Sequence, residues 1–194
     1  MTDWVKPTKA QEAAARAMVE AIVPALRTEK GTHAETAIAA AARMGGTFLF
    51  RSFHLPTAGI EPGAPVFSDL ANDQGPALMQ TFAFGAVGEG LDPTTMNRDM
   101  QVPDQNRPLL TVNQTQSKLE PALRAIAAKH RLTDVQAAHA CALAAAKLVK
   151  MTVQVLPPHM GLTVAAYGFV EGSKTMPIAL PAAAPGKKPW YRFW

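Results

Sequence analysis

"THAETAIAAAARMGGTFLFRSF", residues 32–53, is the stretch of sequence that decides the fold. Alanine dominates its first half, and alanine is the strongest helix former and a poor strand former. The whole chain of 194 residues has a similar character, being 48% hydrophobic but only 7% aromatic. Small side chains let helix backbones approach one another closely. The sequence therefore predicts an all-α fold of tightly packed helices.

Helix starts are indicated by the pattern [ST]-x-x-[EQ], the capping box, which satisfies two free amides at a helix N-terminus. It occurs at four places that precede amphipathic or alanine-rich runs, starting at Thr8, Thr32, Ser117 and Thr133. These starts predict helices over residues 9–29, 33–52, 118–130 and 134–151, the first of them kinked or divided at Pro24. Two further helices are expected to begin at proline and end at glycine, over 76–90 and 158–172.

The alternative is a mainly α fold with one short two-stranded pairing. "FLFRS" (48–52) and "MTVQV" (151–155) are short and rich in aromatic or β-branched residues. Such runs also suit strands, so the pattern leaves both readings open.

The order of motifs indicates an internal duplication. "PALR" occurs at 24–27 and 121–124, and "FGAVGEG" (84–90) is echoed by "YGFVEG" (167–172). We therefore expect a six-helix bundle of two tandem three-helix repeats with pseudo-twofold symmetry. The expected boundaries are about 8–96 for repeat 1, with an inserted connector at 54–75, and about 115–176 for repeat 2. Both lie in one helical domain, 1–180, followed by a basic aromatic tail, 181–194.

Small residues also predict which helices lie at the centre. They form one face of the 33–52 helix, around Ala37 and Gly45, and one face of the 134–151 helix, around Ala138 and Ala145. Because such faces permit close backbone approach, we expect this pair to cross at the centre of the bundle.

Charge and cysteine content narrow the class of protein. The formal net charge is +4, but Lys187, Lys188 and Arg192 lie in the last ten residues, so the body is nearly neutral. A neutral body lacks the basic surface of a nucleic-acid-binding domain, and we expect no nucleic-acid partner. One cysteine, no secretory signal and no apolar run long enough for a membrane span predict a soluble cytoplasmic protein.

Catalytic and metal-binding motifs are incomplete. His33-Ala34-Glu35 has the His-x-Glu spacing of zinc deaminases, but those enzymes also need a Pro-Cys-x-x-Cys segment and this chain has a single cysteine, Cys141. No two histidines stand four residues apart, and there is no Gly-x-Ser-x-Gly elbow. We therefore interpret Thr32 and Glu35 as a capping box, and expect no metal, no cofactor and no catalytic residue.

A ligand site, if present, is expected in a groove between the two repeats. Its candidate residues are Glu89, Glu171, Phe84, Tyr167 and Arg51. Both acids stand at a helix C-terminus, where the helix dipole disfavours them, so a partner such as Arg51, Arg98 or a ligand cation would stabilise each of them. The sequence favours the alternative, that both are solvated carboxylates without a partner.

The tail offers a second candidate surface, for docking on a protein. Its residues Trp190, Tyr191, Arg192 and Trp194 combine aromatic rings with positive charge, as interface residues often do. The sequence favours a non-catalytic interaction or scaffold module that forms a homo-oligomer or binds a protein partner through the 54–75 connector or this tail. The alternative is a small-molecule-binding protein or enzyme with its site between the repeats.

Overall fold

A computed structural model describes residues 4–97 and 101–180 of the chain. Within these residues there are six α-helices and no strand, apart from two isolated bridges that join Thr28 to Gly31 and Pro65 to Thr175. The helices are α1 (Lys9–Ala25), α2 (Ala34–Ser52), α3 (Asp69–Gly88), α4 (Val112–Lys129), α5 (Asp134–Met151) and α6 (Pro158–Ser173). The all-α prediction is confirmed. The strand alternative is wrong, because 48–52 continues α2 and 151–155 forms the end of α5 and a turn.

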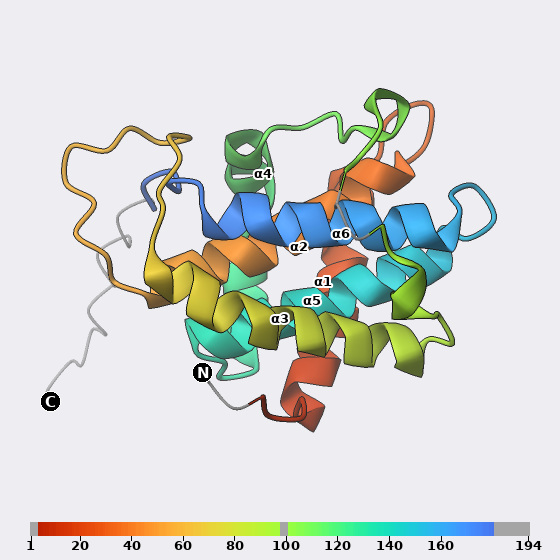
Figure 1. Cartoon of the computed structure of the whole chain (residues 1–194), viewed down its shortest axis with the longest axis horizontal. Helices are drawn as coiled ribbons and strands as arrows, with labels where there is room; N and C mark the ends of the chain where they lie inside the picture. The colour runs from red at the N-terminus through yellow and green to blue at the C-terminus, as the bar shows by residue number, and fades with distance from the viewer. Residues whose placement is uncertain (1–3, 98–100, 181–194) are drawn as a thin grey trace, which may run out of the picture.

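The helices are arranged as three layers of two (Figure 1). The middle layer is α2 and α5, which pack against each other. Helices α3 and α6 lie in front of them in this view, with α6 on α2 and α3 on α5, and α1 and α4 lie behind. Thus α3, the third helix of the first half of the chain, packs on α5 of the second half. In the same way α6, the third helix of the second half, packs on α2 of the first half.

The central position of α2 and α5 follows from their small side chains, as predicted. In α2, 17 of 19 residues are buried. A Cβ added to Gly45 would lie only 3.3 Å from the Ala138 carbonyl oxygen and 3.3 Å from the Cys141 Cβ. Glycine and alanine at this crossing therefore bring the two backbones to a separation that larger residues would prevent.

Two of the four predicted capping boxes are present, at Thr8 in α1 and Thr133 in α5. The box at Thr32 and Glu35 is wrong: His33 is the N-cap residue of α2, and its Nδ1 accepts from the Thr36 amide at 3.4 Å. The Thr32 hydroxyl instead donates to the Val23 carbonyl oxygen, which ties α2 to α1.

The box predicted at Ser117 is also wrong, because α4 begins earlier. Thr111 and Gln114 form the capping box of that helix and have the same spacing. The pattern [ST]-x-x-[EQ] therefore occurs twice within ten residues, 111–120, and the first occurrence starts the helix. Glu120 consequently lies within α4 with a buried side chain, free to take part in a different interaction.

Two helix boundaries near prolines differ from the prediction, in opposite directions, whereas Pro158 begins α6 as predicted. Helix α3 begins at Asp69 behind its N-cap Ser68, so Pro76 lies inside it and the connector is 54–68 rather than 54–75. Pro24 lies in the last turn of α1, which ends at Ala25 and does not run to residue 29. Proline costs a helix one backbone hydrogen bond, and the tertiary packing of these helices outweighs that loss.

Candidate functional site

The five residues predicted to line one groove lie in three separate places. Arg51 belongs to a buried ionic network under the C-terminal segment. Tyr167 and Glu171 line a groove between α6 and the linker that joins the halves. Phe84 and Glu89 line a smaller cavity with α5 residues. The tail residues Trp190, Tyr191, Arg192 and Trp194 lie outside the described residues.

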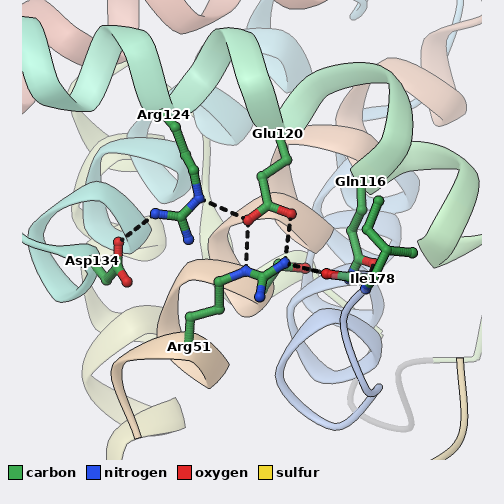
Figure 2. A network of polar contacts seen from close by, with 7 residues as sticks. Arg51, Gln116, Glu120, Arg124, Asp134 and Ile178 are labelled. Atoms are coloured by element: carbon green, nitrogen blue, oxygen red, sulfur yellow. Dashed lines mark hydrogen bonds and ion pairs between the residues drawn. The ribbon is translucent and has the colours of Figure 1, made fainter. Parts of the chain in front are cut away.

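Four charged side chains form the ionic network shown in Figure 2. At its centre is Glu120, which is 1% exposed. Its two oxygens accept from Arg51 Nε at 2.6 Å and Arg51 Nη2 at 2.9 Å, and Oε1 also accepts from Arg124 Nε at 3.0 Å. Arg124 Nη1 donates to Asp134 Oδ1 at 3.2 Å. The formal charges of the four residues cancel, which is a requirement for burying them together.

The network holds the chain after α6 by its backbone. Arg51 Nη2 donates to the Ile178 carbonyl oxygen at 2.7 Å, and Gln116 Oε1 accepts from the Ile178 amide at 3.1 Å. Gln116 is itself fully buried and donates to Thr47 Oγ1 at 3.0 Å. Both polar groups of one extended residue are therefore bound by side chains whose positions are fixed by other contacts (Figure 2).

The connector pairs with the same C-terminal segment. The Gly63 amide donates to the Met176 carbonyl oxygen at 2.8 Å, the Met176 amide donates to the Ala64 carbonyl oxygen at 2.8 Å, and the Val66 amide donates to the Lys174 carbonyl oxygen at 2.7 Å. The two elements that the sequence analysis considered for partner binding, the connector and the chain leading to the tail, thus lie side by side.

Arg43 forms the second polar site and was missed by the sequence analysis. It is 5% exposed, and its Nε and Nη2 lie 2.8 and 2.7 Å from Glu171 Oε2, while Nη1 donates to the Leu110 carbonyl oxygen. Two adjoining cavities of about 500 and 560 Å³ share this ion pair as a wall, and Tyr167 lines the first of them. The sequence feature that could have indicated this site is Arg43 itself, a charged residue in the middle of the alanine-rich helix α2.

Glu89 and Glu171 both have basic partners, so the favoured expectation of solvated carboxylates is wrong, and the partners differ from those named. Glu171 pairs with Arg43, and Glu89 Oε1 lies 2.5 Å from Lys147 Nζ. Arg51 pairs with Glu120 and is not available to either acid, and Arg98 lies outside the described residues. Each acid at the end of a third helix therefore pairs with a base on the second helix of the other half.

His139 joins α5 to α3 and to the start of the chain. Its Nδ1 lies 2.6 Å from Thr81 Oγ1, which accepts from Trp4 Nε1 at 3.0 Å. The Trp4 ring in turn packs on Phe84 with a centroid distance of 5.7 Å. Burial lowers the pKa of His139 below its usual value of 6.5.

Acidification is expected to destabilise the protein through His139. Because its pKa is lower in the folded state, the unfolded state binds the proton more tightly, so the free energy of unfolding falls as the pH drops below about 6.5. We expect a His139→Gln variant to show a flatter dependence of the urea midpoint on pH between 5 and 7 than the wild type. Equal slopes would contradict this assignment.

Cys141 is expected to be unreactive in the native protein. Its thiol is fully buried, lies 3.6 Å from Met18 Sδ, and has a pKa raised by burial. Because only unfolding exposes it, reaction with a disulfide reagent at pH 8 should be roughly a thousandfold slower than in urea, where one thiol should react. A fast native reaction would contradict the central position of α5.

The His33-Ala34-Glu35 motif serves the start of α2. His33 Nε2 lies 3.4 Å from Glu35 Oε2, and Glu35 Oε1 accepts from Asn106 Nδ2 at 2.9 Å. Over residues 4–97 and 101–180 no three histidine, cysteine or acidic side chains gather into a possible metal site.

Exposed charge is absent from α6 and from the C-terminal part of α3, although Asp69 and Asp73 are exposed in the first turns of α3. From Pro76 to the end of α3, and along all of α6, no lysine, arginine, aspartate or glutamate is exposed. The exposed residues there are Pro76, Gln80, Phe84, Val87, Gly88, Pro158, His159, Tyr167 and Val170. Helices α3 and α6 contact each other on the front of Figure 1, and we call these exposed residues of the two helices the α3–α6 face. Within it, Phe84 contacts Trp4 and lies beside α1, whereas Tyr167 lies beside the linker.

Comparison with known proteins gives no match: no family model, no curated protein and no solved structure is similar to this chain. None of the helices in the described part of the chain is long and apolar enough to cross a membrane.

Proposed function

We propose that this protein is a non-catalytic interaction module that self-associates through the α3–α6 face. The observation that carries the proposal is the absence of exposed charge from α6 and from residues 76–88 of the neighbouring helix α3. Contiguous apolar surface rimmed by polar groups marks interaction sites in proteins. By contrast, the exposed side of α1 carries Lys9, Arg16 and Glu20, as is usual for a helix in contact with water.

The exposed apolar residues of this face occur at equivalent positions in the two halves. Phe84 and Val87 on α3 correspond to Tyr167 and Val170 on α6, with the same three-residue spacing. All four are among the exposed large hydrophobic side chains. A face with its own approximate twofold symmetry suits an isologous dimer, in which the same residues meet from both copies.

The proposal includes the duplication of a three-helix unit within one folded domain. Gly85 of α3 faces Leu143 and Ala146 of α5, whereas Gly168 of α6 faces Ala39 and Ala42 of α2. In both cases a glycine of a third helix meets the second helix of the other half. Repeated crossings of this kind support a common origin, and the exchange of helices between the halves supports folding as one unit in a cytoplasmic protein.

A charge placed on the α3–α6 face is expected to prevent self-association. Val170→Glu would bury an unpaired carboxylate in the interface, which should weaken the dimer roughly a hundredfold or more. Leu109→Glu is the matched control, because Leu109 is also an exposed apolar residue but lies in the linker. Sedimentation velocity over a concentration series measures both. A wild-type protein that stays monomeric at all concentrations would refute the proposed function.

A second candidate, a small-molecule site, is favoured by the cavities beside Arg43. A buried guanidinium paired with Glu171 presents both a donor and an acceptor to adjoining cavities of about 500 and 560 Å³. That volume suits a small polar ligand. Native mass spectrometry of the purified protein tests both candidates: a dimer mass supports self-association, and a retained small mass lost on denaturation supports the ligand site.

A further inference from the structure

A third cavity, of about 500 Å³, lies at the start of α2 and shares Leu109 and Leu110 with the second of the two cavities beside Arg43. It is enclosed by four segments that are distant in sequence: the turn before α2, the linker around Leu109, α4 at Lys118 and the turn at Val155. The volume lies in the range of small-molecule sites. None of the interactions described above occupies it.

The wall of this cavity is largely apolar. Leu26, Leu109, Leu110 and Val155 line it. Leu109 and Val155 are 71% and 78% exposed, although the Leu109 amide is fixed by a hydrogen bond of 2.9 Å to Thr36 Oγ1. An aliphatic chain lying in the cavity would cover both side chains and remove apolar surface from water.

The charged groups around the cavity are unequally paired. Glu35 is the acidic residue of the cavity lining. Its side chain is buried, accepts a hydrogen bond from Asn106 and lies beside His33. Lys30 and Lys118 also line the cavity, and within the described residues neither forms an ion pair. Two cations therefore remain without a counter-charge next to an apolar wall.

We propose that this cavity binds an amphiphilic anion, namely an aliphatic chain that ends in a carboxylate. The chain lies against Leu26, Leu110 and Val155, and the carboxylate lies between Lys30 and Lys118. The buried, fully engaged Glu35 gives the cavity no free acid that would favour a cationic head group. Neither lysine belongs to the α3–α6 face, so this site is independent of the proposed self-association.

Laurate below its micelle concentration is a suitable probe, with dodecyltrimethylammonium as the chain-matched cation. In ¹H–¹⁵N spectra, laurate should shift the amides of Gly31 and Leu110, and calorimetry should give a saturable single site. The double variant Lys30→Glu/Lys118→Glu should weaken laurate binding about tenfold or more, because two ion pairs are replaced by repulsion. Lys9→Glu/Lys129→Glu makes the same change of net charge elsewhere and should bind laurate as the wild type does.

Three results would overturn the proposal. They are tight binding of the ammonium amphiphile at the same amides, laurate shifts confined to residues such as Phe84 and Tyr167 of the α3–α6 face, and absence of saturable laurate binding. None of them depends on whether the protein dimerises, so failure here and failure of the proposed function are distinguishable.

Discussion

Replacing Gly46 by alanine is expected to destabilise the protein by about 3 kcal/mol or more, lowering Tm by roughly 6–12 °C. A Cβ on Gly46 would lie 2.5 Å from the Phe169 carbonyl oxygen and 2.5 Å from the Ser173 amide nitrogen. Both are backbone atoms of α6, so no side-chain rotation can relieve the overlap. The helices would have to separate, and the apolar contacts between α2 and α6 would be lost along with the close crossing.

The sign of this effect is diagnostic, because helix propensity alone favours alanine over glycine by about 1 kcal/mol. Gly88→Ala is the matched control: Gly88 lies in the last turn of α3, has no positive φ, and a Cβ there meets nothing within 4 Å. We expect that variant to raise the urea midpoint slightly. A Gly46→Ala protein at least as stable as the wild type would contradict the α2–α6 crossing.

The outline of the fold was predictable because it depends on local features. Alanine-rich runs and the boxes at Thr8 and Thr133 identified the helices, and small residues identified α2 and α5 as the central pair. Helix boundaries were less predictable where two local signals compete. At Thr111 and Ser117 the same pattern occurs twice, and at Pro76 tertiary packing overrides an unfavourable residue.

The polar sites were less predictable because they join residues far apart in the chain. Arg51 was singled out on its own, but its partners Glu120 and Ile178 lie 69 and 127 residues away. The capping-box pattern places Glu120 at a helix N-terminus, a role that would keep its carboxylate at the surface. Composition and motif spacing do not predict which distant residues will pair, because the pairing depends on how the two halves of the chain pack.

Replacing Glu120 by alanine is expected to cost about 3 kcal/mol of stability, because it leaves the largely buried Arg51 guanidinium without a counter-charge and leaves Arg124 with Asp134 alone. The same change should loosen the C-terminal segment, since Glu120 orients the Arg51 group that donates to the Ile178 carbonyl oxygen. The urea midpoint measures the first effect, and the rate of tryptic cleavage after Lys174 measures the second. Asp104→Ala is the control, because Asp104 pairs with Arg107 at an exposed position, where an ion pair contributes about 0–1 kcal/mol.

The network has two effects, its contribution to stability and its binding of the C-terminal segment. Replacing Arg51, Glu120 and Arg124 together separates them. In Arg51→Met/Glu120→Leu/Arg124→Met the only charge that loses its partner is Asp134, which is one-third exposed and lies in the first turn of α5, where the helix dipole favours an acid. The methionine at 124 can still cover the Phe48 ring, over which the Arg124 guanidinium lies at 5.1 Å, and much of the lost stability should return. Ile178 would still lack its donor, so cleavage after Lys174 should remain faster than in the wild type. If stability and slow cleavage return together, the segment is held by apolar packing and Arg51 does not act as its clamp. If the single Glu120→Ala variant keeps the wild-type urea midpoint, the network does not stabilise the fold.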